Sequence, residues 1–203
     1  MAVSAVVLAA GLSSRFVDAG RHKLVALVGG TPVVRLSVSA ALDARIGDVV
    51  VVTGAGAPGV EQALTGLDVR LVHEPAFADG MATSLRRGIG AAAPGTEAVV
   101  VALGDQPFVR PEAYQRLVRT WRDTAASIVV PRYADHPGPS HPILLSAVVF
   151  DELLALRGDR GARQVIARDP SRVAIAPLAW GAPMDVDTLA DLARLEDERR
   201  PRD

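Results

Sequence analysis

Short apolar runs rich in β-branched residues recur along this chain, and they restrict its fold more than any other feature. They occupy residues 3–8, 49–53, 69–72, 98–103 and 128–130. Each run is nearly continuously apolar, whereas a strand with one face in water alternates apolar and polar residues. Such runs are typical of strands covered on both faces. The sequence therefore predicts a largely parallel sheet buried between layers of helices.

Segments with helical spacing lie between these runs. The clearest one starts at Pro111, which suits the first turn of a helix. Its apolar positions follow the i, i+3, i+4, i+7 pattern of a helix with one buried face, and they are Tyr114, Leu117, Val118 and Trp121. This spacing predicts a helix that packs on the sheet.

Two further helices are predicted from their start signals. Thr31 and Pro32 supply a cap and a first-turn proline for a helix that runs to about Ala44. Asp187 can cap a last helix, whose apolar positions are Leu189, Leu192 and Leu195.

Strand and helix alternate through most of the chain, which predicts a three-layer α/β/α sandwich with a mostly parallel, Rossmann-like sheet. We expect one domain over residues 1–203, because a chain of this length can bury a single core. Residues 131–142 carry prolines and a glycine and interrupt the alternation, so we interpret them as an excursion over one edge of the sheet. Ligands of such sheets bind at the carboxyl ends of the strands.

Composition excludes several classes of function. The 22 Lys and Arg residues are balanced by 23 Asp and Glu residues, so the net charge of -1 gives no field that would attract nucleic acid or an anionic membrane. Cysteine is absent, which excludes disulfides, thiolate metal sites and a cysteine nucleophile. No apolar run approaches the roughly 20 residues that span a bilayer, and residues 2–10 are interpreted as a buried strand rather than a signal peptide. We therefore expect a cytoplasmic protein without nucleic-acid or membrane partners.

The first predicted strand runs into a loop of small residues that ends in a basic cluster. The loop contains Ala9, Ala10, Gly11, Ser13, Ser14 and Arg15, and the cluster contains Arg21, His22 and Lys23. Small residues allow backbone N–H groups to approach a phosphate closely, and basic side chains neutralise its charge. The loop lacks the glycines of a Walker loop or of the dinucleotide fingerprint. It is interpreted as an anion cradle, with an ordinary surface turn as the alternative.

Two positions offer carboxylates that could hold Mg²⁺. Asp105 follows the apolar run 98–103 in a Gly-Asp-Gln-Pro turn, which places it at the edge where ligands bind. Asp185 and Asp187 are predicted on one side of an extended segment just before the last helix, where a second carboxylate could complete the site. The alternatives are a turn aspartate at position 105 and a helix cap at Asp187.

Three more segments contain candidates for nucleotide or acceptor contacts. Residues 80–88 begin a predicted helix with hydroxyl groups, among them Ser84, and continue into Arg86 and an adjacent arginine, of which at least one must face solvent. His141 lies between constrained residues and could line a pocket, although a lone loop histidine is more often structural. Residues 158–163 form the third segment.

The chain has neither a Gly-x-Ser-x-Gly elbow nor a His-Glu-x-x-His motif, which excludes the matching hydrolase classes.

Six of these segments, in this order, resemble the MobA-like nucleotidyltransferase family, and within it the molybdenum cofactor cytidylyltransferases. They are residues 8–15, the Gly-Met and Ser-Leu-Arg groups of 80–86, Gly-Asp-Gln-Pro at 104–107, His-Pro at 141–142, residues 158–163 and Asp-Val-Asp-Thr at 185–188. The resemblance spans nearly the whole chain and implies a nucleotide-diphospho-sugar transferase-like fold. The Ala-Ala-Gly opening and the Gly-Asp-Gln-Pro turn resemble the cytidylyl branch rather than the guanylyl branch.

The resemblance also implies a role for each candidate residue. Nucleotide contacts would come from Leu8, Ala9, Ala10, Gly11, Ser13, Arg15, Lys23, Ser84 and Gly104, with residues 8–11 at the base and ribose. Asp105 and Asp187 would hold Mg²⁺, and Arg15, Lys23 and Asp105 would be catalytic. Acceptor contacts would come from Arg86, His141, Arg160 and Arg163. The chain departs from the family in a longer spacing between Arg15 and Lys23 and in Ser140, which stands where a glycine is usual.

The implied reaction transfers CMP from CTP to the terminal phosphate of molybdopterin and releases pyrophosphate, with Mg²⁺ as cofactor and a molybdenum hydroxylase as a candidate partner. One alternative keeps the fold but uses another base or acceptor, as a guanylyltransferase does. A second is an NAD(P)H-dependent reductase of the same family, against which the missing dinucleotide fingerprint argues. A third is a non-catalytic chaperone that carries the finished molybdenum cofactor, although a carrier has no need of Asp105, Asp187 and Lys23 together.

Overall fold

A computed structural model of the chain describes residues 1–16, 22–136, 138, 140–159 and 161–199. Its centre is a seven-stranded sheet with the order β5-β4-β1-β6-β8-β7-β9. The strands are β1 (Val3–Ala9), β4 (Val49–Thr53), β5 (Arg70–His73), β6 (Ala98–Leu103), β7 (Ile128–Arg132), β8 (Ile143–Ser146) and β9 (Val173–Pro177). Strand β8 is antiparallel to both neighbours, and the other pairs are parallel. The predicted α/β class with a mostly parallel sheet is therefore confirmed.

The five apolar runs all form strands, with ends that differ from the prediction by no more than two residues. Strands β8 and β9 were not predicted. The apolar run in β8 is only three residues long, and β9 is an edge strand whose side chains are only partly buried, so neither resembles a central strand in sequence. Pro131 was expected in the excursion but belongs to β7, where it pairs with Ala176 of β9.

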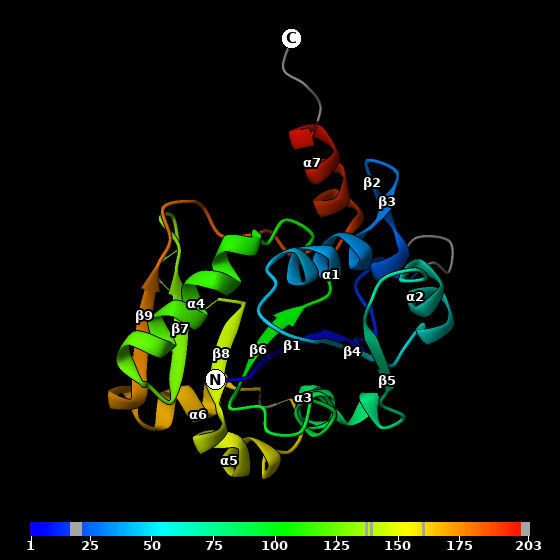
Figure 1. The fold of residues 1–203 in the computed structure, drawn as a ribbon. Helices are drawn as coiled ribbons and strands as arrows, with labels where there is room; N and C mark the ends of the chain where they lie inside the picture. The colour runs from blue at the N-terminus through cyan, green and yellow to red at the C-terminus, as the bar shows by residue number, and fades with distance from the viewer. Residues whose placement is uncertain (17–21, 137, 139, 160, 200–203) are drawn as a thin grey trace.

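Helices cover both faces of the sheet (Figure 1). One face carries α1 (Val33–Asp43) and α4 (Pro111–Thr124), and the other carries α3 (Met81–Gly90), α5 (Phe150–Leu154) and α6 (Arg163–Arg168). Helix α2 (Ala57–Ala63) lies beside α1, and α7 (Leu189–Arg199) contacts the hairpin of β2 (Leu27–Val28) and β3 (Thr31–Pro32). The 3₁₀ turns are η1 (Lys23–Val25), η2 (Phe77–Asp79), η3 (Ala147–Val149) and η4 (Pro170–Arg172). The three predicted layers are thus present.

Successive side chains of the central strands enter two hydrophobic cores. In β1, Ala5 and Val7 pack in the core beneath α1 and α4, whereas Val6 packs in the core beneath α3. Side chains alternate between the two faces of a strand, so a strand covered on both faces is apolar at nearly every position. Gly88 lets α3 approach closely, because a Cβ there would lie 2.3 Å from a methyl carbon of Val6.

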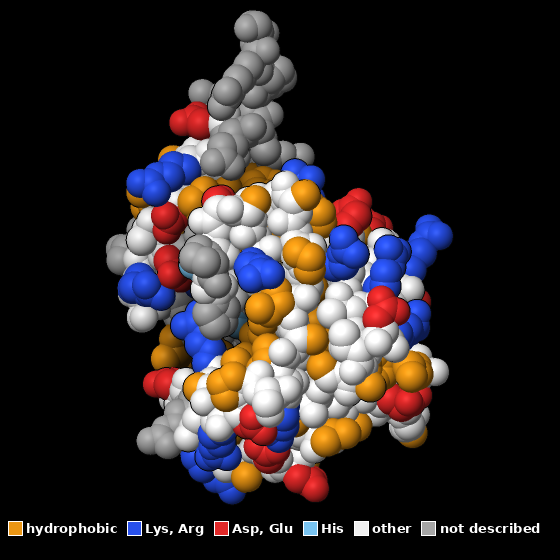
Figure 2. All heavy atoms as spheres, turned by 90° about the vertical axis from the view of Figure 1, so that its left-hand side faces the viewer, with side chains coloured by type: hydrophobic (Ala, Val, Ile, Leu, Met, Phe, Trp, Pro, Cys, Tyr) orange, Lys and Arg blue, Asp and Glu red, His pale blue; other side chains and the backbone are white. Residues whose placement is uncertain are grey.

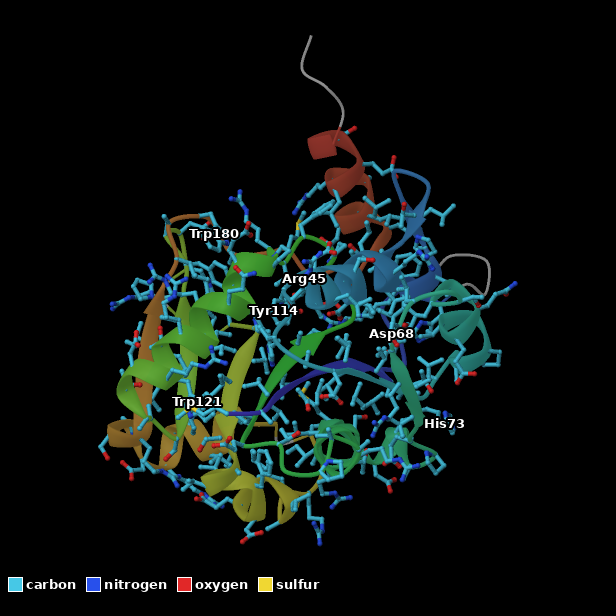
Figure 3. The ribbon with its side chains drawn as sticks, in the orientation of Figure 1. Arg45, Asp68, His73, Tyr114, Trp121 and Trp180 are labelled. Carbon is cyan, nitrogen blue, oxygen red and sulfur yellow. The ribbon has the colours of Figure 1, made fainter. Side chains whose placement is uncertain are left out.

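Two predicted helix starts have different outcomes. Pro111 lies in the first turn of α4, as predicted. The predicted apolar face of this helix is confirmed, because Tyr114 and Trp121 are only 1% and 7% exposed (Figure 3). In α1, however, Pro32 is the N-cap, and no side chain caps the helix. Thr31 belongs to β3, so the prediction that it caps α1 was wrong. The hairpin pairing of β2 with β3 takes up its backbone instead.

The surface shows charges of both signs. Figure 2 views the molecule from the side on which the edge strand β9 lies, and basic and acidic side chains are interspersed over this face. The face therefore lacks an extended patch of one sign among the described residues. Among the residues that the structure describes, no helix is both long enough and apolar enough to cross a membrane.

Candidate functional site

The strand order changes direction at β1, which creates a crevice at the carboxyl ends of the central strands. Strand β1 is flanked on one side by β4 and on the other by β6, which occurs later in the chain. Open α/β sheets bind ligands at such a switch point. A cavity of about 380 Å³ lies here, between the loop after β1, the start of α3 and the turn after β6. The cavity is at the edge of the sheet where ligands were expected.

Most of the predicted site residues line this one cavity. They are Leu8, Ala9, Ala10, Gly11, Ser13, Arg15, Lys23, Ser84, Asp105 and Asp187. Four predicted residues are not among the lining residues, namely Gly104, Arg86, His141 and Arg163. Arg160 lies outside the described residues. The structure thus brings together both metal candidates and every nucleotide candidate except Gly104, whereas the three described acceptor candidates lie outside the lining.

The cavity also has lining residues that were not among the predicted site residues. Leu24 and Phe77 lie outside every segment named from the sequence, whereas Leu12, Met81 and Asp159 lie in named segments but had no role of their own. An apolar residue beside a ligand cannot be distinguished in sequence from an apolar residue of the core. Asp159 lies in a segment that was predicted to face the acceptor, but no sequence signal favoured it over its arginine neighbours.

Close backbone packing holds the loop after β1 on two sides. The Gly104 N–H donates to the Leu8 carbonyl at 2.9 Å, and a Cβ at position 104 would lie 3.2 Å from the same oxygen. On the other side the Ala55 N–H donates to the Ala10 carbonyl at 3.3 Å, and a Cβ on Gly54 would lie 2.7 Å from the Ala10 Cβ. Gly104 therefore supports the loop from behind rather than lining the cavity.

Lys23 joins the two predicted metal-binding carboxylates. Its Nζ donates to Asp105 Oδ2 at 2.6 Å and to Asp187 Oδ1 at 2.8 Å. The Lys23 side chain is only 12% exposed, and this burial opposes its charge, but the charge and hydrogen bond of Asp105 and those of Asp187 outweigh the burial and raise the Lys23 pKa. Lys23 is therefore an ammonium ion at neutral pH. The longer spacing from Arg15 does not carry it out of the site.

Arg15 completes the charged cluster from the rim. Its Nη2 lies 2.9 Å from Asp187 Oδ2, and its side chain is 74% exposed, against 26% for Asp187. An exposed ion pair of this kind contributes little to stability. Arg15 is thus free to exchange its carboxylate partner for a phosphate of a ligand.

The oxygen chemistry of this cluster fits a divalent cation. Asp105 Oδ1 is buried and has no hydrogen-bond partner among the described residues. The Val186 N–H donates to the Asp105 carbonyl at 2.9 Å, which keeps the segment of Asp187 beside Asp105. Within the described part of the chain, no group of three or more His, Cys, Asp or Glu side chains is placed to hold a metal ion. The protein would therefore supply two carboxylates, and Mg²⁺ would take its remaining ligands from phosphates and water.

Asp185 and Asp187 serve different partners. Gln106 Nε2 donates to Asp185 Oδ1 at 2.6 Å, whereas Asp187 contacts Lys23 and Arg15. Burial raises the pKa of Asp185, the Gln106 hydrogen bond opposes this, and the charges of Asp105 and Asp187 add to the rise. Asp187 is therefore the second carboxylate of the cluster, and Asp185 anchors the Gly-Asp-Gln-Pro turn.

The last helix is capped by Thr188 and not by Asp187. Asp191 Oδ2 accepts hydrogen bonds from the Thr188 N–H at 2.8 Å and from Thr188 Oγ1 at 2.7 Å, and the Asp191 N–H lies 3.2 Å from Thr188 Oγ1. This reciprocal pair has the geometry of a capping box. The prediction that Asp187 caps α7 was wrong, because the next residue satisfies the helix start and leaves the Asp187 carboxylate to the cavity.

His22 has a structural role that the sequence analysis did not foresee. Its Nε2 lies 2.8 Å from both the Gly11 carbonyl and Ser13 Oγ, and its Nδ1 faces the Leu24 N–H at 3.4 Å. Burial lowers the His22 pKa, the hydrogen bond to Gly11 opposes this, and the charge of Lys23 adds to the lowering. His22 was predicted only as a member of a basic cluster, yet a neutral ring that binds the loop after β1 fits these contacts.

The start of α3 contributes one of its predicted residues to the cavity. Ser84 is among the lining residues, whereas Arg86 donates from Nη1 to the Leu156 carbonyl at 3.2 Å, away from the cavity. Arg87 is exposed, as expected for one of two adjacent arginines. A Cβ at Gly80 would lie 2.3 Å from the Gly158 carbonyl carbon, so the 158–159 turn packs directly against the helix start. The acceptor role expected of Arg86 lacks support from its position.

His141 and Arg163 lie together outside the cavity lining. Burial, and then the charge of Arg163, lower the His141 pKa to about 4. The His141 carbonyl accepts a hydrogen bond from the Tyr133 hydroxyl at 2.8 Å, which ties the residue to the end of β7. His141 is therefore a neutral, structurally held side chain at neutral pH.

A crevice with a small-residue loop, two basic side chains and a carboxylate pair suits a triphosphate with its cation. Ser13 Oγ lies 2.8 Å from His22 Nε2, but Nδ1 of that ring accepts from the Leu24 N–H, which leaves the ring proton on Nε2 and makes His22 a donor rather than a base for Ser13. The charged groups of the described residues therefore suit positioning and charge neutralisation, which is what phosphoryl transfer requires. The fold and the site together define the class of nucleotidyltransferases.

Comparison with known proteins gives the family. The profile of the MobA-like NTP transferase domain matches residues 5–173, and the chain therefore belongs to this family. It is 33% identical over 139 residues to the bifunctional protein GlmU of Cereibacter sphaeroides, and 31% identical over 131 residues to that of Syntrophomonas wolfei. These alignments cover 67% and 64% of the chain but only 30% and 28% of the two relatives. The chain thus spans less than a third of their length.

Solved structures agree with this assignment. The Rv0371c protein of Mycobacterium tuberculosis H37Rv superposes with a TM-score of 0.83 and 32% identity, covering 97% of this chain and 98% of that one. Its complex with manganese matches at 30% identity and a TM-score of 0.81, with 97% and 99% covered. A nucleotidyl transferase from Methanothermobacter thermautotroptrophicus has 28% identity and a TM-score of 0.81, with 97% of both chains covered. The likeness extends over nearly the whole length of each protein.

Proposed function

We propose that this protein is a Mg²⁺-dependent nucleotidyltransferase, folded as one domain over residues 1–203, that transfers CMP from CTP to molybdopterin in the cytoplasm. One observation carries the proposal. Lys23, Asp105 and Asp187 meet at hydrogen-bond distance in the cavity formed by the loop after β1. The cavity thus combines phosphate-binding and cation-binding groups at one edge of the sheet.

We assign different parts of the nucleotide to different residues of the cavity. Residues 8–11 would receive the base and ribose, because the small side chains of Ala9, Ala10 and Gly11 leave backbone groups at the cavity wall. Ser13, Arg15 and Lys23 would bind the phosphates through charge-assisted and hydroxyl hydrogen bonds. Ser84 offers a further hydroxyl from the start of α3.

The reaction needs no covalent intermediate with the protein. An oxygen of the acceptor's terminal phosphate attacks the α-phosphorus of CTP, the bond from that phosphorus to the bridging oxygen breaks, and pyrophosphate leaves with this oxygen. Asp105 and Asp187 would hold Mg²⁺, which supplies neutralisation of the phosphate charges when it is bound. Lys23 and Arg15 neutralise the charge that develops on the phosphate oxygens, because they are held beside the cavity before the ligand arrives.

The base and the acceptor rest on sequence similarity to the cytidylyl branch. The Ala-Ala-Gly opening and the Gly-Asp-Gln-Pro turn support CTP, and the Mn²⁺ complex of the Rv0371c protein supports a divalent cation. For the acceptor, the 158–159 turn is the best-placed segment, because it packs against α3 and contributes Asp159 to the cavity. The acceptor role of His141 and Arg163 stays a prediction, since neither residue lines the cavity.

The test is nucleotide turnover by the purified protein. The protein is incubated with Mg²⁺, molybdopterin and either CTP or GTP, and both pyrophosphate and the dinucleotide product are measured. We expect product with CTP and a lower kcat/KM with GTP, because a mismatched buried base edge is costly to bind. A preference for GTP would overturn the base assignment. Pyrophosphate from neither nucleotide, together with binding of the finished cofactor, would instead show a carrier.

A further inference from the structure

The ammonium group of Lys23 stands where a cation held by the carboxylate pair would stand. It lies 2.6 Å from Asp105 and 2.8 Å from Asp187, and its side chain is 12% exposed. Lys23 binds one oxygen of each carboxylate, Arg15 binds Asp187 Oδ2, and the remaining oxygen, Asp105 Oδ1, is buried. An ion that bridges the two carboxylates would therefore have to displace these basic side chains. Lys23 and a bridging divalent cation therefore compete for one position.

Charge balance strengthens this competition. The carboxylates of Asp105 and Asp187 carry two negative charges, and Lys23 and Arg15 carry two positive ones. A divalent cation that enters alone would meet two carboxylates whose charges Lys23 and Arg15 already balance, and a nearby ammonium that repels it. A cation that enters with a triphosphate brings anionic oxygens, and these offer Lys23 and Arg15 new partners as they leave the carboxylates.

We propose that Lys23 closes the carboxylate pair to free divalent cations, so that the site accepts the cation only as its complex with a nucleoside triphosphate. This inference rests on the proposed function, because it takes the nucleotide as the ligand of the cavity. Lys23 then has two positions, one on the carboxylates before binding and one on the phosphates after it. The exchange couples metal binding to nucleotide binding.

A titration with Mn²⁺ tests this proposal without any turnover. Free Mn²⁺ is measured by electron paramagnetic resonance as it is added to the wild-type protein, to Lys23→Met and to Arg122→Met. Arg122 is exposed on α4, so its variant is the control for the loss of one positive charge away from the site. We expect Lys23→Met to bind Mn²⁺ about tenfold or more tightly in the absence of nucleotide, since removing a contacting like charge is worth more than about 1.4 kcal/mol.

Two further measurements keep the outcome clear. The double variant Lys23→Met, Asp105→Asn should lose the increased Mn²⁺ affinity of Lys23→Met. This result would show that the added Mn²⁺ binds at the carboxylate pair. CTP should tighten Mn²⁺ binding to the wild-type protein. Equal Mn²⁺ affinity of wild type and Lys23→Met, with both shown to be folded by circular dichroism, would overturn the proposal even if the wild type turns over CTP. If Lys23→Met binds Mn²⁺ more tightly than the wild type without nucleotide but the wild type does not turn over CTP, only the proposed function is overturned.

A separate set of contacts gives His22 a positioning role. Its Nδ1 accepts from the Leu24 N–H, which leaves the ring proton on Nε2, and Nε2 then donates toward the Gly11 carbonyl and Ser13 Oγ, each at 2.8 Å. On its other side the ring lies against Gly56, where a Cβ would come within 2.9 Å of it. Ser13 has a φ of 54°, a left-handed conformation that is costly for serine without support.

We infer that His22 is a positioning residue that holds Gly11 and Ser13 in the shape that receives the phosphates. Because Nε2 is the donor, the Ser13 hydroxyl keeps its own hydrogen for a phosphate oxygen. This role also rests on the proposed function, but it depends on contacts that Lys23, Asp105 and Asp187 do not make.

Conservative replacement separates positioning from general stability. His22→Ala should raise the KM for CTP about tenfold while kcat changes by no more than about twofold. This result is expected when a contact that binds the ground state and the transition state equally is lost. His22→Gln, whose amide can donate near the Nε2 position, should recover part of the affinity. His73→Ala removes a histidine on β5 and is the control (Figure 3). An unchanged KM in His22→Ala, or no recovery by glutamine, would overturn the inference; a wild-type protein that binds no nucleotide would overturn the proposed function itself.

Discussion

Lys23 Nζ lies 2.6 Å from Asp105 Oδ2, although 82 residues separate the two in the chain. The contact brings the basic end of the loop after β1 to the carboxyl end of β6, two places that the sheet sets side by side by pairing β1 with β6. The candidate site therefore depends on the strand order. The role of each of its residues can be tested by a substitution that removes one contact.

Asp105→Asn should abolish nucleotide transfer and leave folding stability nearly unchanged. The amide cannot replace the charge of a cation-binding carboxylate, and losing an electrostatic contact in the transition state typically costs about 3–4 kcal/mol. Turnover is measured with CTP, and stability by urea unfolding. Asp68→Asn, at an exposed aspartate labelled in Figure 3, removes the same charge outside the site and should retain full activity. Near-native turnover by Asp105→Asn would remove this residue from the mechanism.

Lys23→Ala should slow the chemical step by about one to three orders of magnitude, because it removes a charge-assisted phosphate contact from a partly buried site. Arg15→Ala should have a smaller effect, since the Arg15 side chain is 74% exposed and its charge is screened by solvent. Single-turnover rates at saturating CTP compare the two variants. A silent Lys23→Ala would show that its contacts with the carboxylates have no counterpart with the nucleotide.

Gly88→Ala should destabilise the protein by about 1–3 kcal/mol, the usual cost of overpacking a core. The new Cβ would lie 2.3 Å from Val6 Cγ1 and 3.1 Å from Val52 Cγ2, so α3 would have to move away from the sheet. Gly90→Ala in the same helix is the matched control, because no atom lies within 4 Å of its new Cβ. It should be neutral or stabilising, by up to about 1 kcal/mol. Equal free energies of unfolding for the two variants would contradict the close packing of α3.

The protein should lose stability as the pH falls from 6.5 toward 4, in part because of His141. Burial and the charge of Arg163 lower its folded-state pKa from 6.5 to about 4. Between these values the unfolded chain binds the proton and the folded protein does not, so protonation favours unfolding. The stability contributed by the neutral ring is fully present above pH 6.5, and the loss at low pH is at most about 3 kcal/mol.

Urea unfolding at several pH values measures this slope. His141→Gln should flatten it, whereas His136→Gln, at an exposed histidine of the neighbouring loop, should leave it as it is in the wild type. The titration of the His141 ring by NMR gives its folded-state pKa directly. A value near 6.5 would show that the ring is solvated.

The sequence alone determined the parts of this protein whose signals are local. Nearly continuous apolar runs identified the central strands, because a strand buried on both faces is apolar at nearly every position. Pro111 and the spacing to Trp121 identified α4 in the same way. Asp105 could be placed at the ligand edge because the carboxyl end of a buried parallel strand has only one location in such a fold.

Only the tertiary structure decided which side chains meet. Thr188 and Asp191 cap α7 and release Asp187 to Lys23, 164 residues away, whereas Arg86 turns to the Leu156 carbonyl. Strands β8 and β9 likewise obtain their places from pairing with β7, and not from a pattern of their own. Periodicity and capping signals act over a few residues, but an ion pair depends on the path of the whole chain. For that reason the sequence could nominate both carboxylates, and the packing of the sheet and its loops selected their partners.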